Sequence, residues 1–217
     1  MKVLCYNGES ALNVNGESFY GYDLVVFGFD GLKKINYKNE LSGAENSLPK
    51  FASLSKKTKK VIISGAITDN YGIIRKSAVI SENGKLLGIS DMNLNVNSSP
   101  YSQGGGYRVY QTAKGRIGLL IGDDIIDFDG VKSMALCDAD VLIVLVGSEE
   151  KPQYNFLVRS YSYLFGLPIL LISNMGMLAS DISGEICGGS REKICEMVIP
   201  TKKSYRIIQS KRRGVKE

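Results

Sequence analysis

Residues 115–130 read GRIGLLIGDDIIDFDG, and this stretch decides both the expected fold and the expected chemistry. The apolar run IGLLI at 117–121 predicts a buried β-strand. Gly122, Asp123 and Asp124 follow directly and predict an abrupt turn at the end of that strand. Because Gly122 has no side chain, the first residue of this turn cannot supply a nucleophile.

The composition is that of an ordinary globular protein. The 217 residues are 44% hydrophobic and 23% charged, which predicts one domain, residues 1–217, with a substantial core. Its apolar runs are strand-sized, and the start of the chain lacks the pattern of a signal peptide, so we expect a cytoplasmic protein with no membrane partner. Most of the net charge of +5 lies in the tail at 201–217, which we interpret as a solvated terminus rather than a nucleic-acid site.

The chain contains no histidine, and this excludes several site chemistries. Mechanisms that use Ser-His-Asp or Cys-His pairs, and zinc sites with histidine ligands, need a residue that is not present. The four cysteines form no CxxC pair and are read as reduced thiols. We therefore predict no cofactor and no metal.

Strand-like and helix-like segments alternate along the chain without a low-complexity linker, which predicts an α/β domain. Asn83 and Gly84 predict a hairpin turn between strands at 72–82 and 85–94. Helices are expected at 48–60, 128–137 and 153–165, the last ended by Gly166. Further strands are expected at 2–6, 23–27, 61–67, 107–112, 116–121, 141–146, 168–173, 194–199 and 205–208.

Five segments, in order, resemble the nitrilase or carbon-nitrogen hydrolase superfamily: DLVVF at 23–27, the hairpin at 72–94, YRVYQTAKGRIGLLIGDD at 107–124, ALCDADVLIVLVGS at 135–148 and RSYSYLFGLPILLISNMG at 159–176. The resemblance covers residues 2 to about 199 and rests on the order and spacing of the segments. It implies an α+β fold, a four-layer αββα sandwich of two mixed sheets. The family's long first helix is replaced by residues 7–22, which carry three glycines, so we expect part of that sheet face to be exposed or covered by a partner.

The family's chemistry uses a glutamate as base, a lysine to stabilise charge and a cysteine as nucleophile. The resemblance places these roles at Phe29, Asp91 and Gly122, and none of the three residues can perform its role. We expect no rescue from neighbours: Asp30 is out of register, Lys76 and Lys85 lie well back from the end of the hairpin, and Cys137 reads as a small buried thiol. Asp91, Asp123 and Asp124 are read as solvated turn or cap residues in preference to a cation site.

Three functions follow from these observations. The first is a nitrilase-like protein without hydrolase activity, a pseudoenzyme that acts as a binding or scaffolding module. The second is an active carbon-nitrogen hydrolase of amidase type that acts on a small amide through displaced residues. The third is an unrelated α/β protein.

The vestigial pocket is the expected ligand site, with no catalytic residue. Its candidate ligand-binding residues are Phe29, Asp91, Gly122, Asp123 and Ser148, and Phe29 either walls the pocket or fills it. The resemblance also implies a homodimer, and the apolar residues of the helix at 153–165 supply a surface for it. Those residues are Tyr154, Phe156, Leu157, Tyr161 and Leu164.

Overall fold

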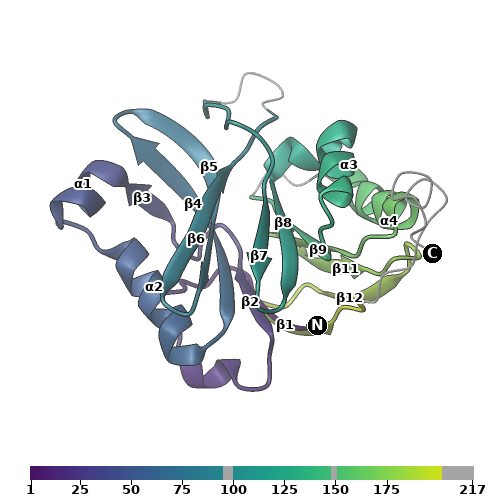
Figure 1. Ribbon diagram of the computed structural model, residues 1–217, viewed down its shortest axis with the longest axis horizontal. Coiled ribbons are helices and arrows are strands. Elements are labelled where there is room, and N and C mark those ends of the chain that lie inside the picture. The colour runs from purple at the N-terminus through teal and green to yellow at the C-terminus, as the bar shows by residue number, and fades with distance from the viewer. Residues whose placement is uncertain (95–99, 148–150, 202–217) are drawn as a thin grey trace, which may run out of the picture.

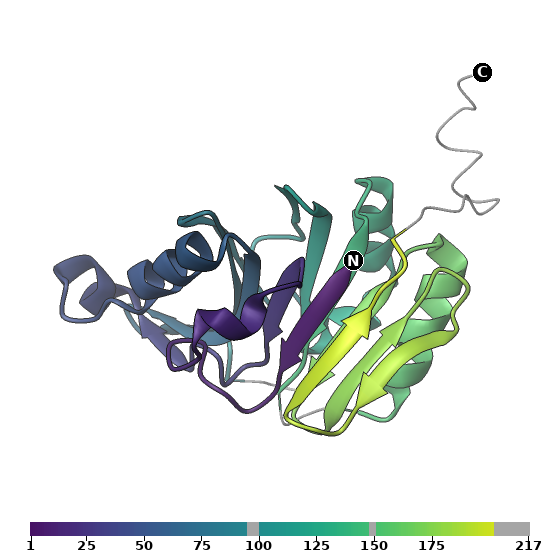
Figure 2. The ribbon, with the colours of Figure 1, turned by 90° about the horizontal axis from the view of Figure 1, so that it is seen from below.

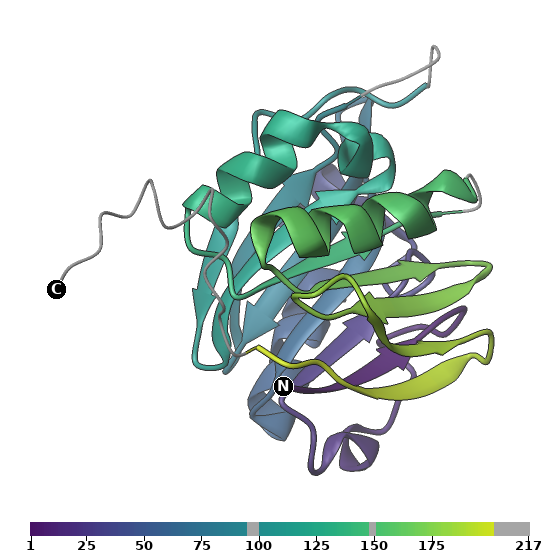
Figure 3. The ribbon, with the colours of Figure 1, turned by 90° about the vertical axis from the view of Figure 1, so that its right-hand side faces the viewer.

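The computed structural model describes residues 1–94, 100–147 and 151–201, and these residues form two β-sheets that pack face to face (Figure 1). Helices α1 (Tyr37–Ser42) and α2 (Ser47–Thr58) lie outside one sheet. Helices α3 (Phe128–Leu136) and α4 (Gln153–Phe165) lie outside the other, as Figure 3 shows from that side. The four-layer αββα sandwich predicted from the sequence is confirmed.

The first sheet is mixed, with parallel pairing at its centre and antiparallel pairing at both edges. The short strand β3 (Lys34–Asn36) pairs in parallel with the far half of β4. Figure 2 shows the last strand beside the first, where the two ends of the fold meet. In spatial order the strands are β13 (Ile194–Val198), β1 (Lys2–Tyr6), β2 (Leu24–Phe27), β4 (Val61–Asn70), β5 (Ile73–Glu82) and β6 (Lys85–Asp91).

The second sheet is also mixed, and it contains strand β8 at the start of the stretch 115–130. Strand β8 pairs in parallel with β9, so its carboxyl end points the same way as that of the buried strand beside it. In spatial order the strands are β12 (Ile186–Ser190), β11 (Gly176–Ser180), β10 (Ile169–Ser173), β9 (Val141–Leu145), β8 (Gly115–Ile121) and β7 (Val109–Thr112).

Alternation along the strands builds three apolar layers, because successive side chains point to opposite faces of a sheet. One set of side chains, such as Val26 and Ile143, fills the space between the sheets. The other set on the first sheet, such as Val25, packs under α2. The other set on the second sheet, such as Val144, packs under α3 and α4. The strands at the centre of each sheet are therefore buried on both faces, which explains their continuous apolar sequences.

The local signals in the sequence are confirmed where they were strongest. Asn83 and Gly84 both have positive φ, 49° and 83°, and join β5 to β6 in the predicted hairpin. Helix α4 ends at Gly166, whose φ of 59° is the left-handed conformation that favours glycine. The predicted strand at 205–208 lies outside the described residues.

Several short elements were not predicted. Strands β11 and β12 each have five residues, and β12 reads ICGGS, whose glycines leave no alternation to detect. Strand β3, helix α1 and the 3-10 turn η1 (Gly16–Phe19) are also too short for a periodic signal. The 3-10 turn η2 (Gly122–Ile126) lies where the sequence predicted an abrupt turn.

We expected part of the sheet face near residues 7–22 to be exposed or covered by a partner, but over β1 and β2 the chain itself covers it. Phe19 and Ala11 are fully buried against that face, and they cover it without a long helix. The ring of Tyr6 stacks on that of Phe27 with centroids 4.8 Å apart, and Phe19 meets both rings. A short aromatic cluster thus replaces the packing that a helix would provide. Exposed large apolar side chains nearby include Tyr20 of the covering segment and Val198 of the edge strand β13.

None of the described helices is long and apolar enough to cross a membrane.

Candidate functional site

The turn after β8 is built around one buried carboxylate, that of Asp124. Its Oδ1 accepts the backbone N–H groups of Asn93 at 2.7 Å and Leu94 at 2.8 Å, and its Oδ2 accepts that of Ile121 at 3.1 Å. Burial raises the pKa of Asp124 to about 7, and the three N–H donors oppose that rise. Asp124 thereby ties the end of β8 to the segment after β6. It is a buried acceptor and not the solvated residue predicted from the sequence.

Gly122 begins the turn, and the space that a side chain there would need is occupied. Its φ is +57°, a conformation that residues with a Cβ rarely adopt. A Cβ built on Gly122 would lie 2.9 Å from Sδ of Met92, a fully packed side chain of the core between the sheets. The thioether of Met92 therefore lies against the place that a side chain at position 122 would need.

Asp91 faces away from this turn. It lies directly across from Ser77 in the β5–β6 pair, and Ser77 Oγ donates a hydrogen bond of 2.6 Å to its Oδ1. Arg75 Nε lies 3.8 Å from its Oδ2. Since Ala78, the neighbour of Ser77, belongs to the core between the sheets, Ser77 and Asp91 lie on the outer face. The structure does not bring the carboxylate of Asp91 to Gly122.

Two residues that the sequence did not assign to the site, Met92 and Lys76, face the turn. Met92 follows Asp91 and so points to the opposite face, and its N–H donates to the carbonyl of Lys76 at 2.8 Å. This pairing places Lys76 on the inner face beside Met92, which corrects the prediction that Lys76 lies well back from the site. Burial lowers the pKa of Lys76, and the charge of Asp123 opposes this shift. The Lys76 ammonium lies 4.8 Å from the ring centre of Tyr101.

Phe29 lies between the sheets at the end of β2. The chain crosses the inner face of β4 here, and a Cβ on Gly65 would lie 2.7 Å from Cα of Phe29, so only glycine fits at that crossing. The ring of Phe29 is half-buried and packs against the core between the sheets. An apolar ring therefore stands at the position that the resemblance assigns to the base.

Asp123, the residue between Gly122 and Asp124, is neutralised by a lysine. Lys151 Nζ lies 2.8 Å from its Oδ1, and the Tyr154 hydroxyl donates to the same oxygen. These contacts attach the turn to the start of α4. Among the described residues no three acidic, cysteine or histidine side chains gather as a metal site would require. Ser148, the remaining candidate ligand-binding residue, lies outside the described residues.

The two sheets, their outer helices and the strand end at Gly122 define the class to which this protein belongs. A sequence profile of the carbon-nitrogen hydrolase family matches residues 20–198, and the chain belongs to that family. No protein in a curated collection matches the sequence.

Solved structures show the same fold at low sequence identity. A carbon-nitrogen hydrolase from Helicobacter pylori G27 is 17% identical with a TM-score of 0.76, over 93% of this chain and 89% of that one. The amidase of Nesterenkonia sp. AN1, with acrylamide added at its active-site cysteine, is 11% identical with a TM-score of 0.74, over 92% and 93%. The glutamine-dependent NAD+ synthetase of Acinetobacter baumannii is 18% identical with a TM-score of 0.69, over 90% of this chain but 44% of its own.

Proposed function

We propose that this chain is a member of the carbon-nitrogen hydrolase family that has lost hydrolase activity and acts as a binding or scaffolding module. One observation carries the proposal: the Met92 thioether lies 2.9 Å from the place of a Cβ on Gly122, where the family has its nucleophile. A position without a side chain cannot attack an amide carbon. Because Met92 packs against it, the position also leaves no room for the tetrahedral product of such an attack.

The other two catalytic positions support the same proposal. Phe29 has no proton-accepting group, and Asp91 carries negative charge and is bonded on the outer face to Ser77. Cys5 and Cys137 offer no substitute at the turn. Cys5 is fully buried in the core, where burial raises its thiol pKa, and Cys137 caps the end of α3. Cys137 is exposed, contrary to the prediction of a buried thiol.

The test is ammonia release by the purified chain from a panel of small aliphatic amides and nitriles. We expect no release above that of the heat-inactivated protein. Release that disappears after thiol alkylation would overturn the proposal, because it would show that a cysteine elsewhere performs the attack. Release that survives alkylation would overturn it equally, and would point to a nucleophile other than a thiol.

The alternative, an amidase that uses displaced residues, is favoured by the position of Lys76. Its ammonium belongs to the inner face beside Met92 and interacts with the charge of Asp123, so a cation is present near the turn. If amides are hydrolysed, Lys76→Met should reduce turnover, whereas Lys85→Met, in the exposed hairpin end, should not. Equal activity of both variants would remove this alternative.

We further propose that α4 contributes to a homodimer. Tyr154 and Tyr161 pack against the second sheet and cannot contact a partner, but Phe156 and Tyr163 are 69% and 53% exposed. Light scattering coupled to size exclusion should give a dimer at micromolar concentration. Phe156→Ser should shift it to a monomer without loss of folding, and a wild-type chain that is monomeric throughout would contradict the proposal.

A further inference from the structure

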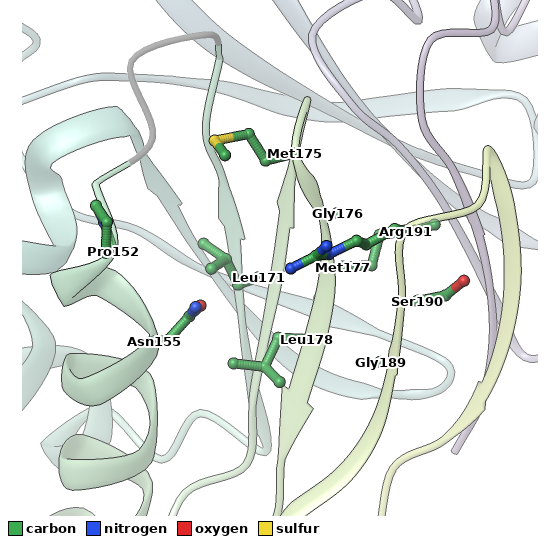
Figure 4. A pocket seen from close by; sticks show the side chains of 10 residues that line it. All are labelled: Pro152, Asn155, Leu171, Met175, Gly176, Met177, Leu178, Gly189, Ser190 and Arg191. Carbon is green, nitrogen blue, oxygen red and sulfur yellow. The ribbon is translucent and has the colours of Figure 1, made fainter.

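A groove lies on the outer face of the second sheet, on the side that α4 leaves uncovered (Figure 4). Its volume is about 830 Å³, within the range of about 300 to 1,000 Å³ typical of small-molecule sites. Helix α4 forms one wall with Pro152 and Asn155, and the end of β12 forms the other with Arg191. Met175 closes one end.

The floor of the groove is a single row of residues across three strands. Leu171 on β10 lies opposite Leu178 on β11, which lies opposite Gly189 on β12. Both leucines belong to the outer apolar layer of this sheet. Gly189 adds no side chain, and a Cβ there would lie 3.2 Å from the carbonyl oxygen of Met177. With strands about 4.8 Å apart, the row gives an apolar floor roughly 10 Å long.

Arg191 supplies a cation at the side of this apolar floor. Its side chain is exposed, and no hydrogen bond or ion pair joins its guanidinium to any residue in the described part of the chain. In Figure 4 the guanidinium of Arg191 extends over the groove, and the side-chain amide of Asn155 points into it from α4. A guanidinium and an amide that flank an apolar surface match a ligand with one carboxylate and one apolar tail.

We propose that this groove binds a small carboxylic acid with an unbranched apolar tail. The carboxylate accepts hydrogen bonds from Arg191 and Asn155, and the tail lies along Leu171 and Leu178. The site is separate from the turn at Gly122, because its floor is on the outer face of the sheet and Gly122 contacts Met92 of the inner core. The inference therefore does not depend on whether the chain hydrolyses amides.

Calorimetric titration of the whole chain with octanoate tests the proposal, with 1-octanol as the matched probe without charge. We expect saturable binding of one octanoate per chain. Arg191→Gln should weaken octanoate binding by about tenfold and leave octanol binding unchanged. Arg108→Gln is the control, since Arg108 is exposed beside β7, at the opposite edge of the same sheet.

Changes in the NMR chemical shifts of backbone amides locate the bound octanoate. We expect them at Leu171, Leu178 and Gly189. Shifts confined to Phe29 or Lys76, equal affinities in Arg191→Gln and wild type, or no binding at all would each overturn the proposal. Shifts at Leu171, Leu178 and Gly189 that follow dimerisation and not added octanoate would also overturn it, because the occupant of the groove would then be a second copy of the chain.

Discussion

Gly122 and Asp124 lie two residues apart in one turn, but their surroundings differ. Asp124 is fully buried and accepts three backbone N–H groups from two segments. Gly122 has no side chain and lies against Met92. The carboxylate that connects the two sheets has its backbone partners, whereas the space beside Gly122 is filled by packing.

The difference shows that the fold and the chemistry of this turn place separate demands on the sequence. Loss of a buried carboxylate leaves several N–H groups without partners, and each costs free energy of folding. Loss of a nucleophile leaves no polar group unsatisfied, and an apolar side chain can fill the space. The proposed loss of the catalytic residues is therefore compatible with a stable αββα sandwich.

The largest expected effect comes from Asp124→Asn. The amide can accept fewer of the three N–H groups, and its own NH2 would face the N–H of either Ile121 or Asn93. We expect a loss of about 3 kcal/mol in the free energy of unfolding, measured by urea denaturation. Asp129→Asn, at an exposed position in the first turn of α3, is the matched control and should change stability little. Equal stabilities would refute the structural role of Asp124.

Met92→Ala is expected to have the next largest effect. Removal of a buried methionine side chain leaves a cavity beside Gly122 and costs about 2 to 3 kcal/mol of unfolding free energy. Met175→Ala serves as the control, because Met175 is 67% exposed. If the two variants lose the same stability, Met92 does not fill the space at the turn.

A smaller effect is expected for Gly122→Ala. The positive φ of Gly122 disfavours any residue with a Cβ, by about 1–2 kcal/mol, and Met92 must also shift to admit the methyl group. Gly105→Ala provides a comparison at an open position where a Cβ meets nothing. A Gly122→Ala chain as stable as wild type would show that the turn can admit a side chain.

The dependence of stability on pH is a further expected effect. The pKa of Asp124 is about 7 in the folded chain against 3.8 for an unperturbed carboxyl, so the folded state binds its proton more tightly than the unfolded state. Stability from this group is present at low pH and is lost as pH rises from about 4 to about 7. The unfolding free energy should depend less steeply on pH in Asp124→Asn than in wild type. Thermal melts that give the same pH dependence for both chains across that range would contradict the prediction.

The sequence predicted those parts of the fold that have local signals. The Asn83-Gly84 turn, the buried strand before Gly122 and the α4 boundary at Gly166 depend on a few adjacent residues, and all three are confirmed. The family resemblance assigned the catalytic positions to Phe29, Asp91 and Gly122, and this assignment stays a prediction.

The placement of the side chains around Gly122 depends on the register of β5 against β6, which cannot be predicted from the sequence. That register sends Asp91 to the outer face, Met92 to Gly122 and Lys76 to the inner face beside it. A signal was present, because residues on either side of Asp91 must point the opposite way in a strand. The packing of Phe19 and Ala11 over β1 was equally hidden, since residues 7–22 contain no periodic pattern.

A double-mutant cycle of Gly122→Ala and Met92→Ala tests the central claim most directly, that the Met92 sulfur fills the space that a side chain at position 122 would need. The unfolding free energies of wild type, both single variants and the double variant are measured by urea denaturation under one set of conditions. The account predicts that Gly122→Ala costs less when Met92 is already alanine, with a coupling energy of about 1 kcal/mol. Additive costs would contradict it, because they would show that the two side-chain positions do not compete for the same space.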